Sequence, residues 1–386
     1  GNSRVVVSVH DSGLDIYHPD IKNRVWTNDG ETPNDGIDND NNGFIDDYYG
    51  YNFAAAVVGG DPTSVYDYGG HGTHTSGTIA AENNNGIGVA GVAGGSKASD
   101  GVRIMMMRLG DDYGSPYIYN PAPSFVYAAD MGSVISSNSW GGGGYDQSLV
   151  DAINYYTSTA SSPALNGGIA IFSAGNSSSS STDYKSELEN VMFVAATNHN
   201  DQKAWYSNYG SWVDISAPGG ETSISYQGVL STLPNNSYGF YQGTSMACPH
   251  VSGVAALMVS KAYGTGLSNY KLFNALIEGT DLIDEFNPNY AGLLGSGRIN
   301  ADKALDLVGT GDGSSNGELI ITPLNIVTEI LDGESKEYNL RLVNTSEYAI
   351  EVELSKENNS SWVDLEAAKL TIPANSVAKS LVTIHS

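Results

Sequence analysis

The chain has 386 residues, with 43 aspartate and glutamate residues against 17 lysine and arginine residues, a formal net charge of −26 and a pI near 4.3. This length allows one large domain and a small one. The acidic surface repels phosphate groups and so disfavours binding to nucleic acid or to anionic membranes. No apolar run is long enough to span a membrane, no signal peptide is visible, and the single cysteine, Cys248, excludes an intramolecular disulfide.

The first predicted element is a buried strand. A β-branched apolar run from Arg4 to His10 ends in Asp11-Ser12-Gly13, which indicates a strand followed by a tight turn. Asp11 is therefore expected at the carboxyl end of a strand, where open α/β sheets hold their active sites.

An acidic segment follows this strand. Its sequence, DNDNNGFIDD, places oxygen-bearing side chains at alternate positions and a glycine at the sharp bend, which is typical of a calcium-binding loop. The twelfth position is Tyr49 instead of glutamate, so the segment departs from an EF-hand. We predict a calcium site here, with a solvated acidic turn as the alternative. The predicted ligands are the side chains of Asp38, Asp40, Asn42, Asp46 and Asp47 and the carbonyl of Phe44.

The middle of the chain alternates predicted helices and strands. A stretch from His71 to Glu82 begins Gly-His-Gly within small and apolar residues, and it predicts a helix whose first turn carries His71. Alternation of helices with buried strands is the pattern of an α/β fold, a parallel β-sheet with helices on both faces. The strands predicted after this helix are Val102–Leu109, Val134–Ser139, Ile169–Ser173 and Val191–Ala196.

Two further segments add reactive groups. Asn176 ends the segment FSAGN, and Ser245 opens a buried helix predicted from Ser245 to Tyr263, with Pro249 expected in the first turn. A helix N-terminus favours negative charge developing on a nearby oxygen. An acid, a base, a nucleophile and an amide donor are the groups that acyl transfer from a peptide bond requires.

The segments around Asp11, His71, Asn176 and Ser245, in that order, resemble the subtilisin-like serine proteases, or subtilases, over roughly residues 4–310. The resemblance implies a subtilisin-like fold and a serine endopeptidase. It implies that Ser245 attacks the scissile carbonyl, that His71 takes its proton, and that Asp11 orients His71. The Asn176 amide and the Ser245 backbone N–H would stabilise the oxyanion.

The same resemblance implies a site for an extended substrate. One segment would pair with the substrate backbone and form a wall of the pocket for P1, the residue whose carbonyl is attacked, and a second segment would form the opposite wall. Trp140 either contributes to a hydrophobic subsite or belongs to the core. The residues implied are Ser139, Trp140, Gly141 and Gly142 for the first wall and Ala174 and Gly175 for the second.

Asp183 is the expected floor of this pocket. In many subtilases a small residue before a Tyr-Pro pair takes that place, and Asp183 precedes Tyr184 and Lys185 when the preceding serine run is aligned without a gap. One interpretation is a carboxylate that pairs with lysine or arginine at P1. The other is a shifted loop that leaves Asp183 solvated and a pocket for a large apolar or aromatic P1 side chain.

A second calcium site is implied by the resemblance alone. Asp20 and Asn85 would bind through their side chains, and Asn83, Ile87 and Val89 through their carbonyls. The family is usually secreted behind a signal peptide and an inhibitory propeptide. We therefore expect a secreted, mature or trimmed monomer that acts on protein or peptide substrates, with the propeptide as a partner before maturation.

The C-terminal part of the chain has a different pattern of apolar, polar and turn-forming residues. A Gly/Ser-rich linker spans residues 310–317, and from Glu318 onward short alternating strands lie between turns. This pattern predicts a subtilisin-like catalytic domain over residues 1–312 and a small immunoglobulin-like β-sandwich over residues 318–386. The sandwich would bind, space or assist folding. A cell-surface adhesion protein with an incidental protease domain is the alternative to a secreted endopeptidase.

Overall fold

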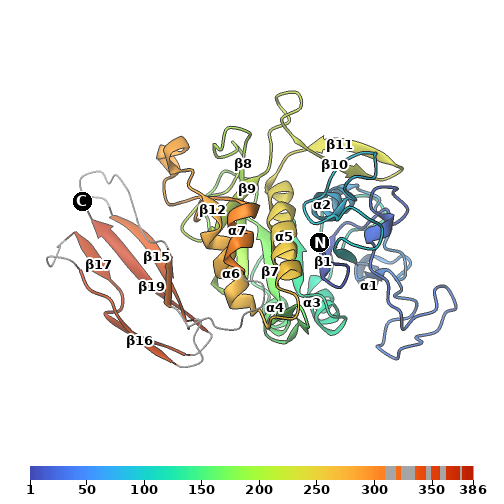
Figure 1. Ribbon diagram of the computed structural model, residues 1–386, viewed down its shortest axis with the longest axis horizontal. Coiled ribbons are helices and arrows are strands. Elements are labelled where there is room, and N and C mark those ends of the chain that lie inside the picture. The colour runs from blue at the N-terminus through green and yellow to red at the C-terminus, as the bar shows by residue number, and fades with distance from the viewer. Residues whose placement is uncertain (309–318, 323–334, 345–348, 357–361, 374–375, 386) are drawn as a thin grey trace.

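A computed structural model describes residues 1–308, 319–322, 335–344, 349–356, 362–373 and 376–385. Residues 1–308 form a large central sheet with helices on both faces (Figure 1). The predicted linker, residues 310–317, lies outside the described residues. In the described ranges, no helix combines the length and the apolar character that crossing a membrane requires.

The central sheet has nine strands in the order β12-β13-β9-β8-β7-β4-β1-β3-β2. Each neighbouring pair is parallel except β12 with β13, which is antiparallel. The chain adds β2 and β3 on one side of β1 and the later strands on the other. The strands are β1 (Val6–Asp11), β2 (Gly50–Asn52), β3 (Arg103–Arg108), β4 (Ile135–Asn138), β7 (Ile169–Ser173), β8 (Val191–Thr197), β9 (Ile215–Pro218), β12 (Thr280–Asp281) and β13 (Arg298–Ile299).

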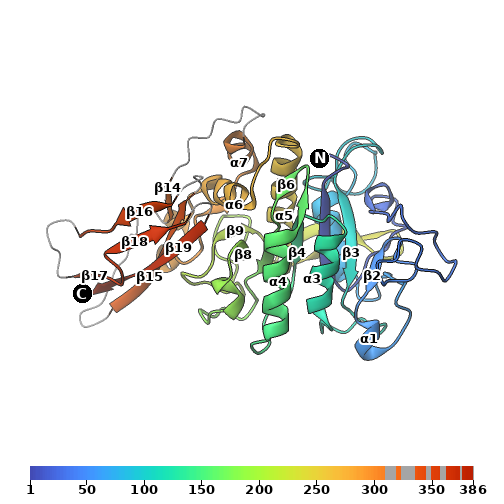
Figure 2. The ribbon, with the colours of Figure 1, turned by 90° about the horizontal axis from the view of Figure 1, so that it is seen from below.

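Each face of the sheet has its own apolar core, because successive strand residues point to opposite sides. In β7, Ile169 and Ile171 belong to one core and Ala170 and Phe172 to the other. Helices α2, α5, α6 and α7 cover the first face, and α3 and α4 cover the second (Figures 1 and 2). The helices are α1 (Ala55–Val58), α2 (His71–Ala80), α3 (Pro121–Asp130), α4 (Gln147–Thr159), α5 (Thr244–Lys261), α6 (Asn269–Glu278) and α7 (Ala301–Leu307).

This architecture confirms the predicted α/β fold class, and the four predicted strands from Val102 to Ala196 correspond to β3, β4, β7 and β8. One local prediction is wrong. Helix α5 begins at Thr244, so Pro249 lies in its second turn and not in its first. A proline there has no N–H to donate to the carbonyl four residues earlier, which is the carbonyl of Ser245.

Two short antiparallel pairs lie outside the central sheet. The hairpin β10 (Val229–Leu233) and β11 (Ser237–Tyr241) precedes α5 and packs on α2. There Ser231 and Thr232 donate hydroxyl hydrogen bonds to the carbonyls of His74 and Thr73. The other pair is β5 (Ser161–Ser162) and β6 (Leu165–Asn166).

The described C-terminal residues are all strands and turns. They form a four-stranded sheet, β14-β15-β19-β17, and a two-stranded sheet, β16-β18. Leu342, Val352 and Ile372 make a small core that joins residues of both sheets. The closer likeness to an immunoglobulin-like module stays a prediction. The strands are β14 (Leu319–Thr322), β15 (Ser335–Asn344), β16 (Ile350–Glu353), β17 (Val363–Leu365), β18 (Lys369–Ile372) and β19 (Ser376–His385).

Candidate active site

The predicted catalytic residues come from different elements that meet at one edge of the sheet. Asp11 is the last residue of β1, His71 is the first residue of α2, and Ser245 is the second residue of α5. Asn176 lies just beyond the end of β7. Since β1, β4 and β7 run parallel, their carboxyl ends share the edge at which open α/β sheets hold active sites.

Asp11 and His71 form a close pair. The Nδ1 atom of His71 lies 2.7 Å from Oδ1 of Asp11, and the Asp11 side chain is only 3% exposed. The backbone N–H of Ser12 donates to the same oxygen at 2.7 Å, and the Thr75 hydroxyl donates to Oδ2 at 3.3 Å. A carboxylate held this way fixes the proton of the imidazole on Nδ1 and leaves Nε2 free to accept one.

The environment of His71 also sets its pKa. Burial by itself would lower this pKa, but the negative charge of Asp11 and the hydrogen bond to it outweigh burial, and the pKa is raised above its ordinary value of 6.5. The imidazole therefore holds a proton more readily than a free histidine does. This is the property needed in a base that receives a proton from a serine hydroxyl.

Ser245 and Ser139 exchange two hydrogen bonds. The Ser245 hydroxyl donates to the Ser139 carbonyl at 3.0 Å, and the Ser139 hydroxyl donates to the Ser245 carbonyl at 2.8 Å. The Ser245 carbonyl is available because Pro249 has no N–H for it. To pass its proton to His71, the Ser245 hydroxyl must leave the Ser139 carbonyl and turn toward Nε2.

Two N–H groups lie near Gly243, beside Ser245. Oδ1 of Asn176 accepts hydrogen bonds from the Thr244 backbone N–H and hydroxyl, both at 2.9 Å, so the amide nitrogen of Asn176 is left to face the site. A Cβ placed on Gly243 would lie 3.5 Å from this nitrogen and 3.5 Å from the Ser245 backbone nitrogen. Both donors thus border one space, and they can stabilise an oxyanion there.

The first predicted substrate wall, Ser139 to Gly142, follows β4 directly. Gly141 and Gly142 are exposed, and Gly142 has a φ of +80°, which favours glycine. Trp140 is half-buried and stands edge-on to Phe172 with ring centroids 5.2 Å apart. The tryptophan therefore packs against the core, and a contact with substrate stays a prediction.

The second predicted wall begins at the end of β7. Gly175 has a φ of +100°, and a Cβ there would lie 2.6 Å from the amide nitrogen of Asn208. That nitrogen donates to the Ala174 carbonyl at 2.8 Å, and the Gly175 N–H donates to the Thr244 hydroxyl at 3.0 Å. Only glycine fits this place, and the wall is anchored to the first turn of α5.

Asp183 lies beside the first wall. Its Oδ2 atom is 3.4 Å from the backbone nitrogen of Gly142. The carboxylate also pairs with Lys185, a partner that the sequence analysis does not name. The role of Asp183 toward a P1 side chain stays a prediction.

Comparison with models of known protein families shows which family this chain belongs to. The model of the subtilase family matches residues 2–297 of this chain. The chain belongs to the subtilase family, the family of the subtilisin-like serine endopeptidases.

Relatives and solved structures agree with this assignment. The subtilase is 33% identical over 303 residues to thermitase of Thermoactinomyces vulgaris, which covers 78% of this chain and 88% of that protein. It is 33% identical over 305 residues to a thermophilic serine proteinase of Bacillus sp. (strain AK1), of whose length it spans 62%, with 79% of this chain covered. A protease structure from Pseudoalteromonas arctica PAMC 21717 superposes with a TM-score of 0.59 at 29% identity, covering 80% of this chain and 91% of that one.

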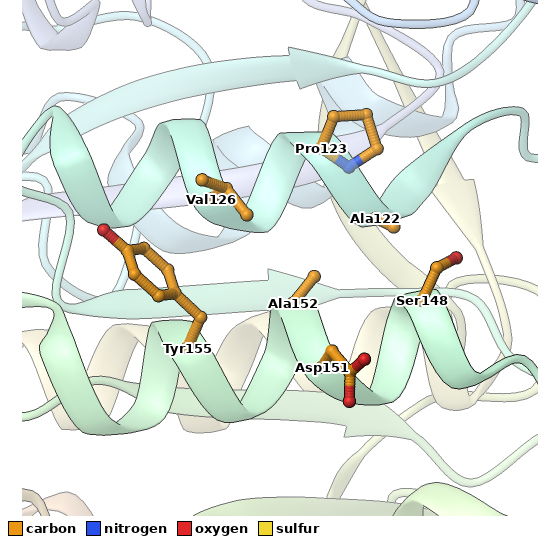
Figure 3. A pocket seen from close by; sticks show the side chains of 7 residues that line it. All are labelled: Ala122, Pro123, Val126, Ser148, Asp151, Ala152 and Tyr155. Carbon is orange, nitrogen blue, oxygen red and sulfur yellow. The ribbon is translucent and has the colours of Figure 1, made fainter.

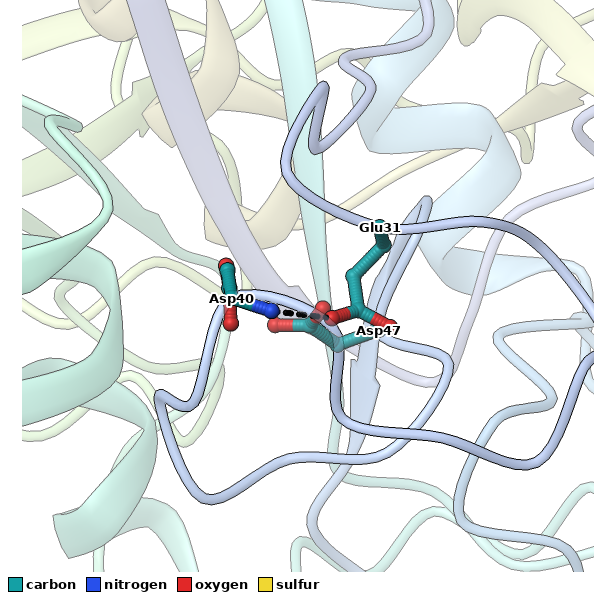
Figure 4. A group of neighbouring side chains, drawn as sticks. All are labelled: Glu31, Asp40 and Asp47. Carbon is teal, nitrogen blue, oxygen red and sulfur yellow. Dashed lines mark hydrogen bonds between the residues drawn. The ribbon is translucent and has the colours of Figure 1, made fainter.

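The acidic segment of the subtilase gathers three carboxylates. Oxygens of Glu31, Asp40 and Asp47 lie within 4.8 Å of one another (Figure 4). Asp47 is fully buried and Glu31 is 6% exposed. In the part of the chain that the structure describes, none of the three pairs with a lysine or arginine. Buried carboxylates without a cationic side chain fit a bound cation, and oxygen ligands suit calcium.

Neighbouring polar groups hold this acidic cluster, Glu31, Asp40 and Asp47, in place. The Asn28 amide donates to Asp40 at 2.9 Å and to Asp47 at 2.8 Å. The Asn42 amide donates to Asp40 at 3.2 Å and to Asp47 at 2.8 Å. Asp40 and Asp47 thus share both amides. These hydrogen bonds stabilise the two carboxylates, but a neutral amide does not neutralise their negative charge.

The structure separates the predicted ligands of this loop. Asp40, Asn42 and Asp47 lie together, whereas the carboxylates of Asp38 and Asp46 accept hydrogen bonds from backbone N–H groups of the loop, at Asn42, Gly43, Asp35 and Gly36. Metal ligation by Asp38, Phe44 and Asp46 stays a prediction. The sequence analysis missed Glu31 and Asn28, which precede the repetitive segment. Their only signal is a position in the same turn-rich stretch.

The second predicted calcium site is also assembled around a buried carboxylate. Asp20 is fully buried, and its two oxygens accept hydrogen bonds from the Asn85 amide at 2.5 Å and the Val89 backbone N–H at 2.9 Å. Burial, the charge of Asp20 and a hydrogen bond to it together raise the pKa of the Tyr238 hydroxyl to about 12. Asn85 and Val89 therefore lie at this carboxylate as N–H donors, whereas the side-chain oxygen of Asn85 accepts the Ile87 backbone N–H at 3.1 Å. Calcium binding by Asp20, Asn83, Asn85, Ile87 and Val89 stays a prediction.

A hollow between α3 and α4 lies apart from these sites (Figure 3). None of the predicted catalytic or metal-binding residues lines it. Tyr155 at one end donates its hydroxyl to Asp130 at 2.7 Å. The lining is formed by Ala122, Pro123, Val126, Ser148, Asp151, Ala152 and Tyr155.

Proposed function

We propose that this subtilase hydrolyses internal peptide bonds of extended protein substrates through an acyl-enzyme intermediate. The observation that carries the proposal is the pair of the buried Asp11 with the partly exposed His71 at the same sheet edge as Ser245, together with the Asn176 amide and the Ser245 backbone N–H, which both lie near Gly243. The substrate backbone lies along residues 139–142 and adds a strand there.

Acylation begins when the Ser245 hydroxyl turns to His71 and attacks the scissile carbonyl. His71 takes the hydroxyl proton on Nε2, and Asp11 stabilises the imidazolium through Nδ1. The carbonyl oxygen becomes an oxyanion between the Asn176 amide and the Ser245 backbone N–H. One such donor contributes roughly 10²–10³ in rate, a value measured on subtilisin. His71 then protonates the leaving amine, and the ester to Ser245 remains.

Deacylation repeats these steps with water. His71 takes a proton from the water molecule that attacks the ester carbonyl, and the same two donors stabilise the second oxyanion. Collapse of this intermediate returns the proton from His71 to Ser245. The carboxyl product leaves, and the hydroxyl can again bond the Ser139 carbonyl.

Calcium stabilises the fold in this proposal and takes no part in the chemistry. Glu31, Asp40 and Asp47 would hold one ion, and Asp20 would hold another with carbonyls of the 83–89 loop. The side-chain amides of Asn42 and Asn85 donate hydrogen bonds to these carboxylates and would have to turn to offer an oxygen to the ion. An ion that binds only the folded chain stabilises it by mass action. Calcium outside cells is abundant enough for weak sites, which agrees with a secreted enzyme that has an inhibitory propeptide before maturation.

A fluorophosphonate probe tests the proposed function directly. The protein should be labelled at Ser245 and should cleave a denatured protein into peptides. Ser245→Ala should abolish labelling and reduce cleavage by roughly 10⁶-fold, the size found for the nucleophile of subtilisin. Its melting temperature in calcium should stay close to that of the wild type. Substantial cleavage by the alanine variant would overturn the proposal.

A further inference from the structure

Lys185 is the one buried lysine among the described residues, and its side chain has no exposed surface. A buried ammonium group is costly unless a negative partner compensates its charge. Asp183 supplies that partner, with Nζ of Lys185 at 2.7 Å from Oδ1 and 2.9 Å from Oδ2. Aromatic rings complete the enclosure, since Nζ lies 4.5 Å from the ring centre of Tyr184 and 5.6 Å from that of Phe172.

The carboxylate of this pair faces the predicted substrate wall. Its Oδ2 atom lies 3.4 Å from the Gly142 nitrogen and would lie 3.7 Å from a Cβ on Gly141. Two residues earlier on the same segment, Ser139 contacts the nucleophile through both of its oxygens. The Asp183 carboxylate is therefore next to the segment of residues 139–142, whose first residue contacts Ser245, and the Asp183 side chain is 14% exposed.

The pair is also rigid. Asp183 caps the short helix η2 (Tyr184–Glu187), where its Oδ1 accepts the Lys185 backbone N–H at 3.0 Å. The carboxylate is thus held by its own backbone turn, by Gly142 and by the ammonium group at once. A side chain held at three points cannot turn away to make room for, or bind, a different cation without losing these bonds.

We propose that Lys185 is a specificity-determining residue, because it neutralises Asp183 and gives the P1 pocket an uncharged floor. The wild-type enzyme then selects a neutral apolar or aromatic P1 side chain, although an acidic residue stands beside the pocket. A P1 lysine or arginine would have to compete with an ammonium group that is already bound and cannot leave the protein. This inference rests on the proposed function.

The two members of the pair allow opposite single substitutions. Lys185→Met keeps a side chain of similar length and leaves the Asp183 carboxylate unpaired, so it should raise the ratio of kcat/KM for P1 Lys to that for P1 Phe by roughly tenfold or more. Asp183→Asn keeps the shape and leaves the ammonium group unpaired, so it should raise the ratio of P1 Glu to P1 Phe. The double variant should return both ratios to within about threefold of wild type.

The experiment uses one peptide series that differs only at P1, with Phe, Leu, Lys, Arg and Glu, in calcium-containing buffer. Active enzyme is counted by titration with the fluorophosphonate, so a loss of folded protein does not enter the ratios. A wild type that prefers P1 Lys or Arg to Phe, or a folded Lys185→Met variant with an unchanged ratio, would overturn the inference. If Lys185→Met does not fold, the wild-type preference and the Asp183→Asn ratio decide.

Failure of the proposed function gives a different result. A protein that neither reacts with the fluorophosphonate nor cleaves any peptide of the series would overturn the endopeptidase proposal. An enzyme that is labelled at Ser245 and cleaves peptides without regard to the charge at position 185 would overturn only the role of Lys185.

Discussion

The catalytic edge and the loop of residues 28–47 are held by different kinds of interaction. At the edge, Asp11, His71 and Ser245 lie at the ends of a strand and two helices, and the charge of Asp11 has a partner in His71. The loop has no regular helix or strand over residues 28–47. It is held by hydrogen bonds that backbone N–H groups donate to side-chain oxygens, around the carboxylates of Glu31, Asp40 and Asp47, which have no lysine or arginine partner among the described residues.

From this difference we expect the structure of the loop to depend on the cations in the solvent, and the structure of the sheet edge to be independent of them. The edge is determined by packing of the sheet and helices, so its geometry should persist without any ion. The loop concentrates negative charge, which opposes folding unless a cation offsets it. Changes at the edge should therefore alter rates, and changes in the loop should alter stability.

The largest effect on rate short of removing the nucleophile is expected from Asp11→Asn. The amide cannot hold His71 in the required tautomer, and kcat/KM should fall by about 10⁴-fold, the size known for the same change in a serine-protease triad. The acid limb of the pH profile should move as well. In the wild type His71 becomes protonated, and activity is lost, as pH falls through a pKa above 6.5.

Without the charge of Asp11, the pKa of His71 should fall, so the acid limb of the variant should lie at lower pH. The measurement is kcat/KM against pH for both proteins at constant calcium and ionic strength. An acid limb that does not move would assign it to another group. Both proteins should melt at similar temperatures if the edge is fixed by packing.

Asn176→Ala should lower kcat by roughly 10²–10³ with little change in KM, because the lost hydrogen bond strengthens in the transition state. Thr244→Val is a matched control. It removes the hydroxyl bond to the Asn176 oxygen and the acceptor of the Gly175 N–H but keeps the Asn176 amide donor, so its loss in kcat should be smaller. Equal losses in kcat and KM for Asn176→Ala, measured by steady-state kinetics, would argue against an oxyanion role.

Chelation of calcium should act on the loop. Removing an ion present at about 100 times its Kd costs about 2.7 kcal/mol of stability. Thermal unfolding of the Ser245→Ala protein with and without EDTA measures this without autolysis. Glu31→Gln combined with Asp47→Asn should remove much of the calcium dependence, whereas Asp29→Asn, an exposed neighbour, should retain it. Identical melting with and without EDTA would contradict the calcium proposal.

The smallest effect is expected at Cys248, in the core beneath the active site. Burial raises the pKa of its thiol to about 11, and its side chain is fully buried. The native protein should therefore resist iodoacetamide, which reacts with thiolate. The rate of Cys248 alkylation should stay low after calcium is removed with EDTA if the structure of the sheet edge does not depend on the ion. Fast alkylation in EDTA would show that loss of calcium opens the sheet as well.

The fold was largely predictable because the strands are buried on both faces and appear as continuous apolar runs. Ile169–Ser173 is a strand with the predicted bounds, and its neighbours differ by one or two residues. Helix α5 begins one residue before the predicted start, and Pro249, already the fifth residue from Ser245, lies in the second turn. Such a boundary depends on Gly243 and on the contacts of Thr244 with Asn176, 68 positions earlier in the chain, which a local pattern does not contain.

The site was predictable where function imposes a short motif and less so where contacts are distant. Asp11, His71, Asn176 and Ser245 stand in recognisable segments. Their supporting groups, such as Thr75, do not. The acidic run indicated a calcium loop, but Glu31 joins it only because the chain turns back on itself. Lys185 gave no signal of its pairing, since a lysine in sequence usually indicates an exposed residue.

The two hydrogen bonds between Ser139 and Ser245 hold the predicted substrate segment and the Ser245 hydroxyl in a fixed relative position. The segment that receives the substrate backbone and the atom that attacks it are joined directly, so thermal shifts of one are carried to the other. Changes in the loop after Asn176 can then be tolerated without misaligning the reacting atoms. Pro249 makes this possible. Because proline has no N–H to bond the Ser245 carbonyl within α5, that carbonyl can accept the Ser139 hydroxyl and fix the position of residues 139–142 relative to Ser245.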